Sequence, residues 1–238
     1  MEAKTFTADN AVILAAGFSS RFAPLSQHTP KALLKVKGEV LIERQIRQLQ
    51  ERGIGDIYIV TGYLKEQFTY LKDKMGVSLI ENKEYQWRNN HSSIWAARDV
   101  LANTYICCSD NYFVDNLFTK EAEFPYYSAL YSNGPTEEYC ITADPSGRIT
   151  GVTIGGADSW YMLGHVLFDQ KFSRDFLHIL ESEYDLPQTK DCMWENIYMN
   201  HLDDLTLYIK KYPGDLIREF DTVEDLSLFD PAYRSYLT

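Results

Sequence analysis

The segment from Val12 to Ala16 is a short, uninterrupted apolar run that ends at Gly17. Such a run is typical of a strand buried on both faces of a parallel sheet, because every side chain on it meets other apolar groups. A parallel sheet of this kind needs helices on both of its faces. A loop from residue 17 to residue 30, punctuated by Gly, Ser and Pro, follows the run. This feature predicts an α/β fold.

The chain continues as an alternation of strands and helices up to about residue 110. From Leu41, apolar residues recur every three or four positions up to Gly53, which predicts an amphipathic helix with a glycine at its C-terminal cap. The alternation predicts βαβ units and a Rossmann-like, doubly wound and mostly parallel sheet. The further expected elements are strands at 56–61, 77–80 and 104–109 and helices at 64–74 and 92–101, the last capped by Ser92.

Beyond residue 110 the pattern changes to strands joined by short turns. The sequence Asp-Pro-Ser-Gly at 144–147 is a good hairpin connection. No stretch is long enough or polar enough to act as a linker, so we expect one domain over residues 1–238 with a mixed sheet in its second half. The expected elements are strands at 126–131, 139–143, 148–154 and 161–168 and helices at 172–180 and 192–199.

Charge and composition exclude several classes of protein. The net charge of −11 disfavours nucleic acid as a partner, and the slightly basic first quarter is where a small polyphosphate would bind. No apolar stretch near the start approaches the roughly 20 residues of a membrane span, and the acidic Glu2 and Asp9 are unlike a secretory signal. The four cysteines, two of them adjacent, form no disulfide framework. We expect a cytoplasmic protein with reduced thiols and no membrane partner.

The loop after the first strand carries groups suited to binding phosphate. Ligands of open parallel sheets lie beyond the carboxyl ends of the strands, where this loop begins. Gly17 allows close approach of the backbone to a phosphate, Ser19 and Ser20 offer hydroxyl and amide donors, and Arg21 and Lys31 supply positive charge. The loop is neither a P-loop nor a G-x-G-x-x-G turn. Taken alone, the pattern predicts an anion-binding loop.

Asp110 stands at the end of another expected buried strand. A carboxylate at a strand tip can hold Mg²⁺, a hard ion that binds carboxylates, phosphate oxygens and water. An Asx turn that closes the strand is the alternative. The second carboxylate of a metal site is expected from the acid-rich C-terminal part, with Glu195 as first choice and Asp191 in reserve.

The first strand and its loop together read L-A-A-G-x-x-S-R-x-x-P-L, followed by T-P-K-A-L. This string resembles the signature of the nucleotidyltransferases, which join a nucleoside triphosphate to a phosphorylated small molecule and release pyrophosphate. The resemblance implies that Arg21 holds the outer phosphates and that Lys31 lies at the reacting phosphates. It also implies the nucleotidyltransferase type of Rossmann-like sheet and a catalytic Mg²⁺ on Asp110.

A second stretch narrows the resemblance. The sequence from Asn82 to Ser93 contains Asn-x-x-Tyr and then Asn-Asn before Ser at a helix start, which is similar to the bacterial choline-phosphate cytidylyltransferases. The similarity is close over most of residues 11–118, the expected nucleotide-binding half, and thins over 119–238, the expected acceptor-binding half. It implies that CTP lies against the backbone from Leu14 to Gly17, and that Asn90 and Ser92 read cytosine. An amide suits this role because it both donates and accepts.

The expected acceptor site is aromatic, because a trimethylammonium group donates no hydrogen bond and is bound by π faces and nearby acids. The candidates are Tyr139, Trp160, Tyr161 and Trp194. The expected reaction is Mg²⁺-dependent transfer of CMP from CTP to phosphocholine. Alternatives are transfer to 2-aminoethylphosphonate or phosphoethanolamine, a sugar-1-phosphate nucleotidyltransferase, and a catalytically silent nucleotide sensor. The oligomeric state stays open.

Overall fold

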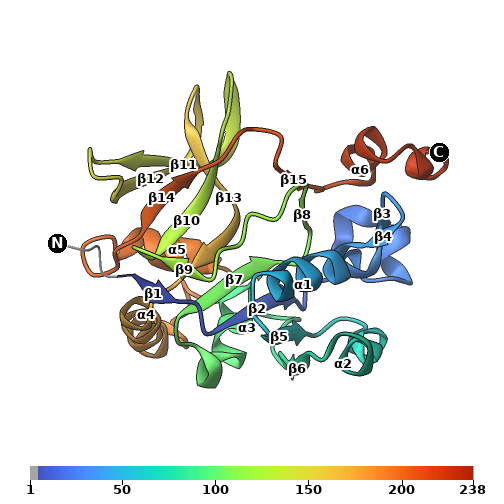
Figure 1. The fold of residues 1–238 in the computed structure, drawn as a ribbon, viewed down its shortest axis with the longest axis horizontal. Helices are drawn as coiled ribbons and strands as arrows, with labels where there is room; N and C mark the ends of the chain where they lie inside the picture. Colours follow the sequence, from blue (N-terminus) through green and yellow to red (C-terminus); the bar gives the residue numbers. More distant parts are fainter. Residues whose placement is uncertain (1–4, 238) are drawn as a thin grey trace.

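The structure is a computed structural model that describes residues 5–237, and its centre is a nine-stranded sheet (Figure 1). Along the main path the strand order is β12-β11-β13-β7-β2-β5-β6, and β10 pairs with both β13 and β14. The strands are β2 (Asn10–Ala15), β5 (Asp56–Thr61), β6 (Ser78–Glu81), β7 (Thr104–Cys108), β10 (Tyr126–Tyr131), β11 (Pro135–Ala143), β12 (Ile149–Ala157), β13 (Trp160–Leu167) and β14 (Tyr208–Lys211).

Strand β2, which contains most of the apolar run from Val12 to Ala16, lies inside the sheet and is buried along its whole length. It runs parallel to β5 on one side and to β7 on the other, with Ile13 opposite Ile59 and Cys107. Side chains alternate along a strand, so Ile13 packs into one layer of the core and Leu14 into the other. This arrangement confirms the prediction of a strand covered on both faces.

Helices cover both faces of the sheet, as the doubly wound pattern predicts. The first layer of the core takes its apolar side chains from α1 (Leu41–Glu51) and α2 (Tyr70–Met75), and the second from α3 (His91–Ala96), α4 (Gln170–Glu183) and α5 (Trp194–Asn200). The α1 helix ends as expected, because Gly53 has a φ of 75° and its N–H bonds to the carbonyl of Gln50 at 2.9 Å. The fold class predicted from the sequence is therefore confirmed.

Two helices differ from the expected ranges. The segment expected as one helix over 64–74 is a 3₁₀ turn at Lys65–Phe68 followed by α2. The helix expected from Ser92 begins at His91 with Asn90 as its cap, and it gives way to a 3₁₀ turn at Arg98–Val100. Ser92 does not cap it, because its hydroxyl instead donates to the carbonyl of Asn89 at 2.7 Å.

The second half of the chain extends the same sheet. Strand β13 pairs antiparallel with β7, with Val166 opposite Ile106, so both halves contribute to one sheet. The predicted hairpin is present between β11 and β12: Asp144 Oδ1 accepts from the backbone N–H of Ser146 at 2.8 Å, and Gly147 has a φ of 89°.

Short elements complete the fold around the central sheet. The most important pair is β8 (Asn111–Phe113) with β15 (Ile217–Glu219), because Glu219 lies opposite Asn111 and so next to the end of β7. Within the described residues no helix is long and apolar enough to cross a membrane, and all four cysteines are free thiols. The remaining elements are β1 (Phe6–Thr7), β3 (Lys35–Val36), β4 (Glu39–Val40), β9 (Glu121–Ala122), α6 (Val223–Phe229) and 3₁₀ turns at Ser20–Phe22, Leu25–Gln27, Lys31–Leu33 and Pro231–Tyr236.

Candidate active site

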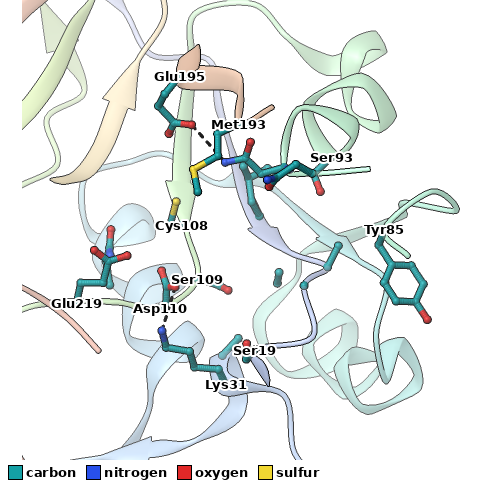
Figure 2. A pocket seen from close by; sticks show the side chains of 18 of the residues that line it. Ser19, Lys31, Tyr85, Ser93, Cys108, Ser109, Asp110, Met193, Glu195 and Glu219 are labelled. Atoms are coloured by element: carbon teal, nitrogen blue, oxygen red, sulfur yellow. Dashed lines mark hydrogen bonds and ion pairs between the residues drawn. The ribbon is translucent and has the colours of Figure 1, made fainter. Parts of the chain in front are cut away.

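A cavity of about 740 Å³ opens at the carboxyl ends of β2 and β7. This is the edge at which ligands bind in open parallel sheets. Figure 2 shows Lys31 and Asp110 pointing toward each other at one end of this cavity and Glu195 at the other. Of the residues singled out from the sequence, the cavity is lined by Leu14, Ala15, Ala16, Gly17, Ser19, Arg21, Lys31, Asn90, Asp110, Tyr139, Asp191 and Glu195.

Lys31 and Asp110, 79 residues apart in the chain, form an ion pair. Lys31 Nζ donates to Asp110 Oδ2 at 3.1 Å, and the lysine side chain is only 8% exposed. Its ammonium group also lies 4.7 Å from the centre of the Phe22 ring. Because a charged lysine is rarely buried without a partner, this arrangement fixes a cation at the base of the cavity.

The other oxygen of Asp110 points to a missing partner. Asp110 Oδ1 is buried and accepts no hydrogen bond from any residue between 5 and 237. A buried carboxylate oxygen is normally satisfied by a donor or a cation. A divalent cation would satisfy this one, so the donor set fits the expected metal.

Glu219 is the carboxylate that sequence reasoning missed. It lines the cavity at the end of β15, and burial together with the negative charges of Asp110 and Asp221 raises its pKa to about 8. Such crowding of acids is costly unless a cation lies among them. The acid-rich C-terminal segment was a signal for such a residue, but only the long-range pairing of β15 with β8 selects Glu219.

The described residues contain no group of three or more His, Cys, Asp or Glu side chains arranged to hold a metal on their own. Two carboxylates therefore leave several positions for phosphate oxygens and water, which is how Mg²⁺ is commonly bound beside a nucleotide.

Glu195 occupies a different part of the cavity from Asp110. Figure 2 shows the two carboxylates on opposite sides of Cys108. The hydroxyl of Tyr127 donates to Glu195 Oε1 at 3.1 Å, and the amide of Asn90 donates to Oε2 at 3.3 Å. Burial raises the pKa of Glu195 to about 7. The geometry thus pairs Asp110 with Glu219 and corrects the expectation that Glu195 stands next to Asp110.

Arg21 reaches the cavity from its exposed rim. Its guanidinium lies 2.7 Å from Asp221 Oδ1, and 68% of its side chain is exposed. A surface ion pair of this kind is weak and exchanges its partner readily. Arg21 is therefore free to turn toward an anion in the cavity.

Of the three serine residues expected at the nucleotide site, Ser19 lines the cavity, whereas Ser20 and Ser92 do not. Ser20 is exposed away from the cavity wall, and Ser92 is buried, where its hydroxyl accepts from the amide of Asn82 at 2.8 Å. The neighbouring Ser93, which accepts from the same amide at 3.1 Å, lines the cavity instead. Ser93 rather than Ser92 or Ser20 therefore lines the cavity, which corrects the expectation for Ser92 and Ser20.

Tyr85, the tyrosine of the Asn-x-x-Tyr stretch, forms an aromatic wall of the cavity, a role that the sequence did not predict. Phe18 packs against it with ring centres 5.2 Å apart, and Tyr85 lines the cavity. A Cβ atom at Gly62 would lie 2.6 Å from Tyr85 Cγ and 2.9 Å from the carbonyl oxygen of Ala16. The glycine is therefore required for the tyrosine to approach the first loop.

Only one of the four aromatic residues expected around the acceptor lines the cavity. Tyr139 does so, and its hydroxyl accepts from the amide of Asn196 at 3.2 Å. Trp194 is 1% exposed and stacks on Tyr127 with ring centres 5.7 Å apart, so it belongs to the core.

The other two expected acceptor aromatics also lie outside the cavity wall. Trp160 packs against Tyr131 and lies 4.9 Å from the ammonium of Lys211. Tyr161 lies opposite Leu130 of β10 and Cys140 of β11 and packs against the first layer of the core. Trp194, Trp160 and Tyr161 thus do not line the cavity, which corrects their candidacy for the acceptor site and leaves Tyr139.

Comparison with known proteins agrees with this architecture. Residues 11–119 match the MobA-like NTP transferase domain. The chain is 34% identical over 215 residues to a choline-phosphate cytidylyltransferase of Streptococcus pneumoniae, covering 90% of this chain and 94% of that protein. It is 36% identical over 228 residues to a 2-aminoethylphosphonate cytidylyltransferase of Lancefieldella rimae, covering 94% of this chain and 93% of the other.

A solved structure extends the agreement to the whole fold. The CTP:phosphocholine cytidylyltransferase from Streptococcus pneumoniae superposes with a TM-score of 0.90 at 32% identity, over 95% of this chain and 100% of that one. The resemblance inferred from the first loop and from the Asn-Asn stretch is thus confirmed. The chain belongs to the family of bacterial nucleotidyltransferases that contains the choline-phosphate and 2-aminoethylphosphonate cytidylyltransferases.

Proposed function

We propose that this chain is a cytidylyltransferase that transfers CMP from CTP to a small phosphorylated or phosphonylated amine, with phosphocholine as the first candidate acceptor. The observation that carries the proposal is the polarity of the cavity. Its two ends differ: the Lys31–Asp110 pair suits a triphosphate, and the buried Glu195 beside Tyr139 suits a cationic amine. An acceptor with a phosphate at one end and a cation at the other matches both.

The nucleotide end can perform an in-line displacement without a general base. The acceptor phosphate is already an anion near neutral pH, so its oxygen can attack the α-phosphorus of CTP directly. Lys31 neutralises charge at the α-phosphate. Arg21 leaves its ion pair with Asp221 and binds the leaving pyrophosphate instead. A divalent cation, which we propose to be Mg²⁺ held by Asp110 and Glu219, supplies further charge neutralisation when bound.

Cytosine is proposed to lie between the first loop and the start of α3. The backbone from Leu14 to Gly17 and the side chains of Ser93 and Tyr85 line this part of the cavity. A hydroxyl that already accepts from Asn82 has its own hydrogen free to donate to the base. Ser93 therefore takes the role that the sequence had suggested for Ser92.

The acceptor cation is proposed to lie against Glu195 and Tyr139. A carboxylate beside an aromatic ring attracts a quaternary ammonium group through charge and through the π face. Residues 11–118 would then build most of the nucleotide end, and residues 119–238 would supply the acceptor end together with Glu219 at the nucleotide end, all within a single domain.

A second candidate acceptor is 2-aminoethylphosphonate, which a specific observation favours. Three of the four aromatic side chains expected for a trimethylammonium cage lie outside the cavity, while Glu195 has the hydroxyl of Tyr127 beside it. A primary ammonium group needs hydrogen-bond acceptors of this kind rather than several rings.

The test is pyrophosphate release with each of the four nucleoside triphosphates and with phosphocholine, phosphoethanolamine, 2-aminoethylphosphonate and a sugar phosphate. We expect turnover that requires a divalent metal, prefers CTP and is fastest with a cationic acceptor. Turnover with 2-aminoethylphosphonate alone would select the second candidate. Equal rates with neutral sugar phosphates would refute the proposed role of Glu195.

A further inference from the structure

The two asparagines before α3 contact the acceptor half of the chain. The backbone N–H of Asn89 donates to the carbonyl of Lys190 at 3.2 Å, and its side-chain amide donates to the carbonyl of Asp191 at 3.0 Å. Asn90 Oδ1 accepts from the backbone N–H of Trp194 at 2.7 Å. The start of the nucleotide-side helix is therefore joined directly to residues 190–194.

The orientation of the Asn90 amide follows from its partners. The backbone N–H of Trp194 can only donate, so the amide oxygen must face it, and the amide nitrogen then faces Glu195 Oε2 at 3.3 Å. Trp194 is the first residue of α5, whose first N–H groups lack partners within the helix. Asn90 thus satisfies the end of α5 and the carboxylate of Glu195 with one side chain.

The carboxylate of Glu195 accepts from two other side chains, which come from different parts of the fold. Tyr127 on β10 holds Oε1 at 3.1 Å, and Asn90 holds Oε2. The Tyr127 ring is buried and stacked on Trp194, so this donor cannot turn away. The Asn90 donor is the one that comes from the nucleotide side of the cavity.

We propose that Asn90 is a positioning residue for the acceptor, which orients the carboxylate of Glu195, and not a reader of cytosine. The inference rests on the proposed function, in which Glu195 meets the acceptor cation. To read cytosine, the Asn90 amide would have to turn its oxygen or its nitrogen toward the base, whereas the oxygen is directed at the Trp194 N–H and the nitrogen at Glu195 Oε2. The side chain therefore links the nucleotide-binding helix to the acceptor site.

The first experiment measures KM for both substrates in the Asn90→Ala enzyme, with phosphocholine or 2-aminoethylphosphonate, whichever is turned over. We expect KM for the acceptor to rise about tenfold, the effect of losing a hydrogen bond to a charged group. We expect KM for CTP and the preference for CTP over UTP to change less than about threefold, because the base contacts remain. A rise in KM for CTP with loss of that preference would overturn the proposal.

A matched control separates orientation of Glu195 from general loosening of the segment. Asn89→Ala removes an amide of the same kind from the neighbouring position, where it bonds to the Asp191 carbonyl rather than to Glu195. We expect this variant to change acceptor KM less than about threefold. An equal rise in both variants would show that Asn90 acts only by holding residues 190–194 in place, and the proposal would fail.

A double-mutant cycle completes the test. Glu195→Ala alone is expected to raise acceptor KM, and adding Asn90→Ala should then cause no further rise, since the carboxylate to be oriented is gone. Additive effects would refute the inference. If Glu195→Ala leaves acceptor KM unchanged, the proposed acceptor site itself is wrong. If Glu195→Ala raises acceptor KM but Asn90→Ala does not, only the role inferred for Asn90 is wrong. Should Asn90→Ala fail to fold, Asn90→Asp keeps the oxygen that Trp194 needs and removes the donor, and a raised acceptor KM is expected again.

Discussion

Replacing Asp110 by Asn tests the centre of the proposed mechanism. The substitution preserves the shape of the side chain and an oxygen that can accept from Lys31 Nζ, now 3.1 Å from the carboxylate. It removes the negative charge, so the buried position of Oδ1 holds either an amide nitrogen or an uncharged amide oxygen. The chain should therefore keep its fold and lose its ability to hold a divalent cation with Glu219.

The magnitude follows from the surroundings of Asp110. Loss of one preorganised electrostatic group commonly reduces kcat by about 10²–10³, or about 3–4 kcal/mol of transition-state stabilisation. The effect on stability should be smaller, because the amide oxygen still accepts from Lys31 Nζ. Lys31 loses a charged partner, but Glu219 loses a repulsive neighbour that raises its pKa.

The assay is steady-state pyrophosphate release over a range of Mg²⁺ concentrations, with thermal unfolding as a check on the fold. Asp115→Asn, at an exposed position close in sequence, is the matched control and should retain full activity. We also expect the pKa of Glu219 to fall in Asp110→Asn, measurable by NMR titration of the carboxyl carbon. Turnover within about threefold of the wild type in Asp110→Asn would refute the role assigned to this carboxylate.

Three further predictions concern the rest of the site. The first concerns Glu195, whose pKa of about 7 in the folded state exceeds the ordinary value of 4.5. The wild type should therefore lose about 2 kcal/mol of its free energy of unfolding as the pH rises from 5 to 8, because protonated Glu195 stabilises the folded state and this contribution disappears. Glu195→Gln should lose less over the same range, as measured by chemical denaturation. An identical pH dependence in both proteins would contradict the assignment. Trp194→Phe should lower the free energy of unfolding by about 1–3 kcal/mol, because it leaves a cavity in the core, and should leave acceptor KM nearly unchanged. A large rise in acceptor KM without loss of stability would show that Trp194 belongs to the acceptor site. Gly62→Ala should raise KM for CTP, because the added Cβ forces Tyr85 away from the first loop; equilibrium binding of CTP measures this, and unaltered affinity would argue against a role for the ring.

Local sequence patterns determined the architecture and the nucleotide end of the cavity. The apolar run from Val12 to Ala16 is predictive because burial on both faces leaves no room for polar side chains, and β2 has this burial. Lys31 and Asp110 were predicted near one another because the carboxyl ends of parallel strands share an edge of the sheet. Their ion pair follows directly from that topology.

The tertiary structure alone decided which residue of a pattern faces the cavity. Ser92 and Ser93 are both almost fully buried, yet only Ser93 lines the cavity, a difference of one position that helix propensity does not resolve. Likewise, Tyr139 lines the cavity while Trp194 fills the core, although both are aromatic residues in the acceptor half.

The sequence by itself thus determined the strands whose carboxyl ends carry the loop with Lys31 and the turn with Asp110, since each strand follows from short-range periodicity. It did not determine that Glu219 joins Asp110 or that Asn90 bonds to Glu195, because each contact joins segments more than 100 residues apart. Such contacts depend on how β15 pairs with β8 and how α5 packs under β10, and these are properties of the whole core rather than of any one segment.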